Sequence, residues 1–341
     1  MEPSTLDSAE RNVSEILAHA VMHGPDDPAV VVYDRQSDLS IGLAEAYKRC
    51  LPKANILDYD TIDSNQILDR FKELTGGDLV VLIQTTRFRM DDFRLRIELF
   101  RRDLKVIEHP HLGRMTESAV ETYVDSLAYD PNYFRGVGRA LAQRIDQAKE
   151  GVIEGDGEKL VFGDGFEKAM LNVGDYAKMK NVGGQYPIGE VVTEAKCLED
   201  LNGRVRIHAF GNRDFQVDQP PVPITLVIEK GRIIGTEDST PEFDVVLDNI
   251  RADEQGEVLV REFGMGLNRA FTRERIVADI GSYERMCGVH LSMGAKHHVY
   301  KKPGIKKKHV RHHVDVFVVA DALSFDGEVV YSGGSWTVGQ G

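Results

Sequence analysis

Histidines are concentrated towards the C-terminal end of this sequence of 341 residues. Six of the 11 histidines lie between Val289 and Asp315. A neutral imidazole is a common ligand of Zn, Fe, Mn and Co ions, so such a group is typical of a metal site. The alternative, for any one histidine, is a packed or solvated side chain without a ligand. The six are His290, His297, His298, His309, His312 and His313.

The last of these histidines is followed two residues later by an aspartate. His313-Val314-Asp315 runs directly into the apolar segment Val316–Val319. On a β-strand, residues two apart point to the same face, so an imidazole and a carboxylate are expected side by side at the start of a buried strand. Taken alone, the pattern is more typical of a surface pair at the entrance to a strand.

Further candidate ligands stand beside glycines and apolar residues. His290 is at the centre of an apolar run bounded by Gly288 and Gly294, with Glu284 shortly before it. Glu190 and Glu262 each lie in a similar setting, which is unusual for a solvated carboxylate. If four carboxylates converged without a metal, they would repel one another and at least one would take up a proton.

The order of these motifs resembles the aminopeptidase T family of leucyl-type metallo-aminopeptidases. The resemblance covers roughly residues 183 to 333 and rests on Gly189-Glu190-Val191, Arg261–Asn268, Glu284 with Gly288–Gly294, and His313-Val314-Asp315. It implies a dinuclear site with two divalent ions, of Zn, Co, Mn or Mg. The implied ligands are Glu190, Glu262, Glu284, His290, His313 and Asp315.

The same resemblance implies a metal-dependent hydrolase that cleaves an N-terminal amide with a metal-bound hydroxide. Glu190 or Glu262 would carry the proton to the leaving amine. Some members of the family have a tyrosine seven residues after the ligand histidine, where this sequence has His297, and the nearest tyrosine is Tyr300. Both are therefore candidate donors to the transition state. The family also implies a homodimer.

A second resemblance gives the alternative function. The 2,5-dihydroxypyridine 5,6-dioxygenases are similar in the same region and hold one Fe(II) with two histidines and an aspartate, which His290, His313 and Asp315 would match. Such a site does not require the three glutamates, so their presence favours the hydrolase. A third alternative is a metal-binding protein without catalytic activity.

The segment between the two ligand histidines is strongly basic. Residues 296–313 carry six lysines and one arginine with no acidic residue. One interpretation is a solvated loop. The other is a lid that attracts an anionic group, so that the substrate is a small peptide or an anionic small molecule.

Short apolar runs alternate with amphipathic segments in the first half of the sequence, which predicts an open, mostly parallel sheet covered by helices. No glycine-rich loop follows the first strand, so dinucleotide binding is not expected. Ser64 and either Asp38 or Ser40 are candidate N-caps. His109 and His111 follow a strand and are either part of a pocket wall or, as is more common for a pair of loop histidines, solvated. The predicted strands are Ala29–Tyr33, Ala54–Tyr59, Leu79–Ile83 and Leu104–Glu108, and the predicted helices are Ser40–Cys50, Ser64–Leu74 and Met90–Arg102.

After a predicted helix at Asn132–Lys149, short strands and tight turns dominate the sequence. We therefore predict an α/β doubly wound scaffold domain over residues 1–150 and an α+β metal-binding catalytic domain with antiparallel strands over 151–341. The predicted strands of the second domain are Gly203–Phe210, Ile224–Glu229, Arg232–Gly235, Val316–Ala320 and Glu328–Tyr331.

The composition limits the partners and the location. With 42 Lys and Arg against 55 Asp and Glu, the formal net charge is −13, which argues against a nucleic-acid partner. The sequence has no apolar run long enough for a membrane span, and from its polar, acidic first ten residues we expect no signal peptide. Three widely spaced cysteines do not form a disulfide framework, so we expect a cytoplasmic protein.

Overall fold

The computed structural model describes residues 1–88, 95–177, 179–296 and 299–339. Packing divides the chain into two compact units. Unit 1 comprises Met1–Arg135 and Val173–Ile188, and unit 2 comprises Gly136–Asn172 and Gly189–Gly341. The predicted boundary after residue 150 therefore falls within unit 2.

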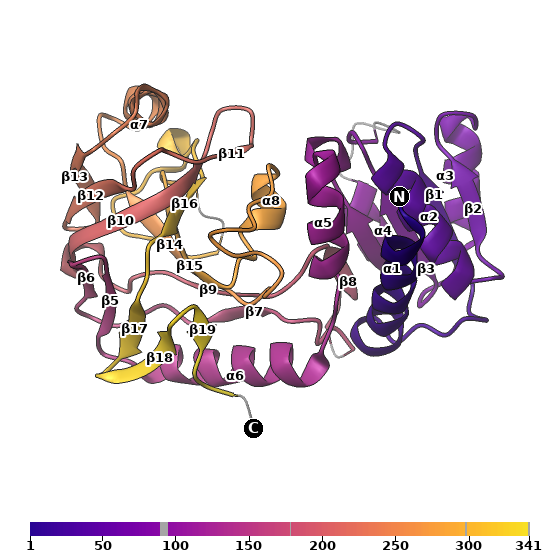
Figure 1. Cartoon of the computed structure of the whole chain (residues 1–341), viewed down its shortest axis with the longest axis horizontal. Coiled ribbons are helices and arrows are strands. Elements are labelled where there is room, and N and C mark those ends of the chain that lie inside the picture. Colours follow the sequence, from indigo (N-terminus) through magenta and orange to yellow (C-terminus); the bar gives the residue numbers. More distant parts are fainter. Residues whose placement is uncertain (89–94, 178, 297–298, 340–341) are drawn as a thin grey trace. The chain divides into compact units, whose positions relative to one another are not determined.

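Unit 1 is built on an open parallel sheet with the strand order β2-β1-β3-β4-β8, which confirms the predicted fold class of this half. Its strands are β1 (Ala29–Tyr33), β2 (Asn55–Asp58), β3 (Leu79–Ile83), β4 (Lys105–His109) and β8 (Gly183–Gln185). Its helices are α1 (Pro3–Glu15), α2 (Asp38–Cys50), α3 (Ser64–Glu73), α4 (Leu95–Arg101) and α5 (Val120–Ser126) (Figure 1).

The predicted caps of two helices of unit 1 were wrong, because Asp38 and Ser64 are the first helical residues of α2 and α3 and the cap is the residue before each. Ser37 caps α2 by accepting a hydrogen bond from the Ser40 N–H, and Asp63 caps α3 by accepting from the Asn65 N–H. Both side chains precede a first turn that leaves N–H groups unpaired, which is where such an acceptor is needed. Of the predicted helix 90–102, residues 90–94 lie outside the described residues.

Unit 2 is built on a large antiparallel sheet, which confirms the predicted α+β class. The main strand order is β19-β18-β17-β5-β6-β10-β16-β15-β14-β9-β7, and β11, β12 and β13 extend it from β10. The strands are β5 (Gly151–Gly155), β6 (Glu158–Phe162), β7 (Met170–Asn172), β9 (Glu190–Thr193), β10 (Leu201–Gly211), β11 (Val217–Asp218), β12 (Ile224–Glu229), β13 (Arg232–Glu237), β14 (Val260–Gly266), β15 (Gly288–Met293), β16 (Val314–Val318), β17 (Ala322–Phe325), β18 (Glu328–Ser332) and β19 (Ser335–Trp336).

Three α-helices accompany this sheet in the described part of unit 2: α6 (Pro131–Gln147), which begins in unit 1, α7 (Pro241–Asp253) and α8 (Ile280–Tyr283). Helix α6 lies beside β18, where Arg144 pairs with Glu328 at 2.6 Å (Figure 1). The hairpin from β12 to β13 turns at Lys230 and Gly231, both with positive φ, as a tight two-residue turn requires.

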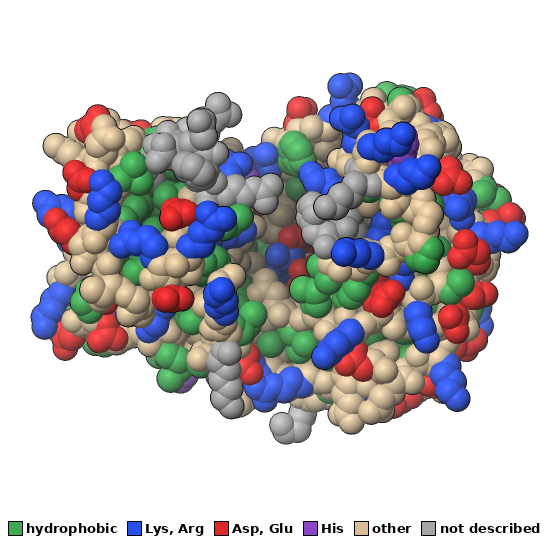
Figure 2. All heavy atoms as spheres, turned by 180° about the vertical axis from the view of Figure 1, so that it is seen from behind, with side chains coloured by type: hydrophobic (Ala, Val, Ile, Leu, Met, Phe, Trp, Pro, Cys, Tyr) green, Lys and Arg blue, Asp and Glu red, His purple; other side chains and the backbone are tan. Residues whose placement is uncertain are grey.

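Acidic and basic side chains are interspersed over the face of the molecule drawn in Figure 2. Among the helices of the described residues, none has the length and the apolar composition that a membrane crossing requires.

Candidate metal centre

Four neighbouring strands of unit 2 carry the candidate ligands, in the order β16-β15-β14-β9. Ser292 of β15 is paired with Asp315 of β16 on one side and with Glu262 of β14 on the other. These three side chains therefore form a row across the sheet. The Ser292 hydroxyl lies within hydrogen-bond distance of Asp315 and is 3.3 Å from Glu262 Oε1. His290 follows on the same face of β15, because it is two residues away.

Glycines on β14 create the space for this histidine. Gly264 is paired with His290, and a Cβ at Gly264 would lie 2.0 Å from His290 Nε2. A Cβ at Gly266 would lie 1.9 Å from the Met286 carbonyl oxygen. The alternation of Glu262 with two glycines thus allows the imidazole and the backbone before β15 to approach β14 closely.

The potential ligands form two overlapping groups. Glu190, Glu262 and His290 make one group and Glu262, His313 and Asp315 the other, and within each group the ligand atoms lie within 4.8 Å of one another. Glu262 belongs to both. A carboxylate has two oxygens with several acceptor sites, so one side chain is able to serve both groups. Five of the six predicted metal ligands are therefore brought together.

The buried group fits a metal ion because it contains an unsatisfied nitrogen. His290 is 1% exposed, and among the described residues its Nε2 has no hydrogen-bond partner, although it lies 3.3 Å from Glu190 Oε1 and 3.5 Å from Glu262 Oε1. Burial lowers the pKa of His290, but these two carboxylates raise it well above its ordinary value. Without metal, the group therefore favours a positive charge at this position.

The second group includes the predicted pair of His313 and Asp315. Their side chains lie side by side as the strand pattern predicted, with His313 Nε2 at 3.3 Å from Asp315 Oδ1. His313 Nδ1 donates to the Lys296 carbonyl at 3.2 Å, which directs Nε2 towards the carboxylates. Burial lowers the pKa of His313, but Asp315 and the other carboxylates raise it to about 10.

Glu284, the sixth predicted ligand, belongs to neither group. Its carboxylate pairs with the guanidinium of Arg285, which also lies 2.8 Å from Glu190 Oε2. Burial raises the pKa of Glu284 to about 8, and the charge of Arg285 opposes this effect. Arg285 is itself only 8% exposed, so the centre contains a fixed positive charge as well as four carboxylates.

An open cavity of about 890 Å³ lies next to the second group. Glu262, His313 and Asp315 all line it, and so does Glu284. Glu190 and His290 do not line it, which places them in the interior of the centre. A substrate in the cavity would therefore meet the group that contains His313.

Of the two predicted transition-state donors, the structure describes Tyr300. His297 lies outside the described residues. Tyr300 does not line the cavity, and its hydroxyl donates to the Lys168 carbonyl. Burial raises the pKa of Tyr300 to about 12, which keeps the hydroxyl protonated for that hydrogen bond.

Sequence reasoning missed Arg285 and Ser292. The period of two along β15 places Ser292 on the same face as His290, and this signal was available in the sequence. Arg285 had no comparable signal, because an Arg next to a Glu is most often a solvated pair.

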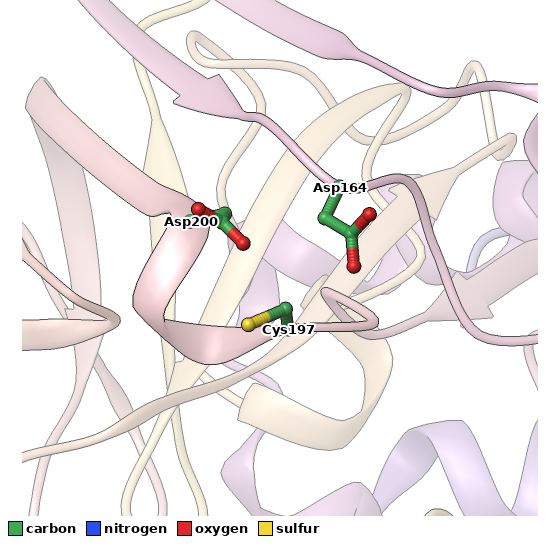
Figure 3. A group of neighbouring side chains, drawn as sticks. All are labelled: Asp164, Cys197 and Asp200. Atoms are coloured by element: carbon green, nitrogen blue, oxygen red, sulfur yellow. The ribbon is translucent and has the colours of Figure 1, made fainter.

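A third group of potential ligands comprises Asp164 and Cys197 in loops of unit 2 and Asp200 at the end of a short 3₁₀ helix (Figure 3). Both aspartates are exposed. A hydrogen bond with Asp200 raises the pKa of the Cys197 thiol. Because the thiolate is the form that binds metal, this group is a poorer candidate than the two groups on the sheet.

Comparisons with known proteins agree with this architecture. No family model matches the chain, and no curated protein matches its sequence. The solved structures that share the fold include the following two. The 2,5-dihydroxypyridine dioxygenase from Pseudomonas putida KT2440 has a TM-score of 0.58 and 14% identity, over 98% of this chain and 96% of that chain. Wild-type AmpT from Thermus thermophilus has a TM-score of 0.58 and 12% identity, over 97% and 99% of the two chains. These identities show a common fold alone.

Proposed function

We propose that this protein is a metal-dependent hydrolase of the aminopeptidase type, with two divalent ions held in the two overlapping ligand groups. The observation that carries the proposal is the shared Glu262, which lies between a buried group and a group that faces a cavity. Divalent ions held there would polarise the carbonyl of the scissile amide and activate a water molecule.

The residues of the chain have separate tasks in this proposal. The single hydroxyl proton of Ser292 orients Asp315, which is nearer to it than Glu262, and the Lys296 carbonyl orients His313. Glu284 lines the cavity without belonging to a ligand group, so its carboxylate is available to pass a proton to the leaving amine. Arg285 holds Glu190 and Glu284 in place.

Metal content and activity test the proposal together. Protein stripped with a chelator and reloaded with Zn, Co or Mn should bind about two ions per chain and hydrolyse aminoacyl anilides. Glu262→Gln should lose both ions, whereas Glu190→Gln should lose the interior ion first. Glu284→Gln should keep the metal and lose turnover. Asp164→Asn, in the exposed group of Figure 3, is the matched control and should change neither quantity.

One observation favours the mononuclear Fe(II) dioxygenase as a second candidate. Arg285 already compensates Glu190, so the interior group carries less uncompensated charge than its two carboxylates imply. In that case His290, His313 and Asp315 would hold one Fe(II), which requires the interior His290 to share an ion with the two ligands that face the cavity. One iron per active chain, with oxygen consumption on a dihydroxypyridine and no anilide hydrolysis, would contradict the hydrolase.

A further inference from the structure

Three cations line the cavity beside the metal centre: Arg213, Lys296 and Arg311. All three are exposed, and in the part of the chain that the structure describes none of their side chains forms an ion pair. Lys302 in the same basic segment differs, because its side chain is 5% exposed and pairs with Glu167. These three cations therefore do not contribute ion pairs that fix the basic loop, residues 296–313, in place.

The cavity also presents an apolar surface. Phe215, Val246 and Ile280 line it, and Phe215 is 63% exposed. An aromatic side chain left in water is a contact surface for an apolar ligand. The volume of about 890 Å³ is within the range of small-molecule sites, which is about 300–1,000 Å³.

The opposite charges of the cavity come from different segments. The carboxylates are those of Glu262 on β14, Asp315 on β16 and Glu284 after α8. Arg213 lies between β10 and β11, and Lys296 and Arg311 lie at the two ends of the basic loop.

Asp253 of α7 also lines the cavity, but its carboxylate is 2.8 Å from His312 Nε2. The three cations are thus available to an anion from outside.

We propose that this cavity binds a small organic carboxylate with an apolar or aromatic body. The carboxylate pairs with Arg213, Arg311 and Lys296, and the body packs against Phe215, Val246 and Ile280. A guanidinium binds a carboxylate through two parallel hydrogen bonds, which makes the two arginines the stronger contacts. That this anion is the substrate rests on the proposed hydrolase function. That the cavity binds the anion does not depend on that function.

Binding is tested on metal-free protein, so that no ion contributes to affinity. The probes are 4-fluorophenylacetate and its neutral counterpart 4-fluorophenylacetamide, followed by fluorine NMR. The carboxylate should bind at least about tenfold more tightly than the amide, because charged hydrogen bonds are the stronger ones. Arg213→Ala and Arg311→Ala should each weaken carboxylate binding about fivefold or more and leave the amide unchanged. Phe215→Ala should weaken both.

Lys306→Ala and Lys308→Ala are the matched controls. Both lysines belong to the same basic loop but do not line the cavity, so each variant should change the affinity by less than about twofold, as expected for a screened distant charge. Equal binding of the two probes, or equal effects of Lys306→Ala and Arg213→Ala, would overturn the proposal. Carboxylate binding without any metal-dependent hydrolysis would refute the proposed function and leave this inference standing.

Discussion

At the scale of single residues, Arg285 determines how much negative charge of the candidate metal centre is compensated without a metal ion. Its guanidinium pairs with Glu190 and Glu284 and is almost completely buried. The sequence suggested that metal ions alone compensate four carboxylates. The structure adds a permanent cation, so the four carboxylates of the metal-free centre repel one another less than the sequence alone implied.

Removing this cation should make the protein more dependent on metal. In Arg285→Met, Glu190 and Glu284 remain buried without their partner, and breaking a buried ion pair in this way costs about 3–5 kcal/mol. We expect metal-free Arg285→Met to unfold at a lower urea concentration than the wild type. Excess Zn should stabilise Arg285→Met more than it stabilises the wild type, because the ion replaces part of the positive charge that the variant has lost. Urea unfolding with and without Zn measures both effects.

Arg251→Met is the control, since Arg251 forms an exposed pair with Asp248 on α7. It should unfold like the wild type in both conditions. If Zn stabilised the wild type and Arg285→Met equally, Arg285 would not compensate the same carboxylates as the metal ions do.

The basic loop is the element that positions His313. The buried carboxylate of Glu254, just after α7, accepts hydrogen bonds from the N–H groups of Ala295 at 2.7 Å, Arg311 at 2.9 Å and His312 at 2.8 Å. One side chain therefore joins both ends of the loop next to a metal ligand. Charged acceptors make stronger hydrogen bonds with backbone N–H groups than neutral ones do.

Glu254→Gln should weaken metal binding without altering any ligand. An amide offers one acceptor oxygen instead of two, so at least one of the three N–H groups loses its bond and His313 becomes less well placed. Loss of such support typically reduces metal affinity about 10–100-fold. Competition with a chromophoric chelator measures the affinity. Glu257→Gln, whose parent carboxylate pairs with Arg232 outside the loop, should leave it unchanged, and an equal loss in both variants would contradict the argument.

The strands and the ligand pair were predictable because they depend on local periodicity. Strands β1, β3 and β12 have the predicted bounds, and the period of two brought His313 beside Asp315. The direction of Tyr300 was not predictable, since it depends on a backbone carbonyl distant in sequence, that of Lys168. Arg285 and Glu254 were missed for a similar reason: Glu190, which pairs with Arg285, and the N–H groups that donate to Glu254 are all distant from them in the sequence.

At the scale of the whole molecule, the ligand groups and the cavity are built from unit 2, and unit 1 has a polar network of its own. His109, at the end of β4, was predicted to be solvated, and this was wrong because it is fully buried. Its Nε2 is 2.8 Å from the Tyr47 hydroxyl and its Nδ1 is 3.0 Å from the Tyr123 hydroxyl. Sequence analysis placed the strand end near His109 but could not show the two tyrosines that surround it.

This network should make unit 1 sensitive to acid. Burial lowers the pKa of His109 to about 3, whereas an unfolded histidine has a pKa of about 6.5. As the pH falls below about 6.5, the unfolded state takes up the proton first, so stability is lost by up to about 1.4 kcal/mol per pH unit until the folded pKa is reached. In His109→Gln, which does not titrate, the loss of stability between pH 6.5 and 5 should be smaller than in the wild type. Urea unfolding, followed by pulsed hydrogen exchange of the peptides that contain β1 to β4, measures this loss of stability in unit 1.

His23, whose pKa is also lowered by burial, is still present in His109→Gln and retains part of the dependence of stability on pH. His19→Gln, at an exposed position, should keep the full wild-type slope, and an unchanged slope in His109→Gln would mean that another group controls the acid response.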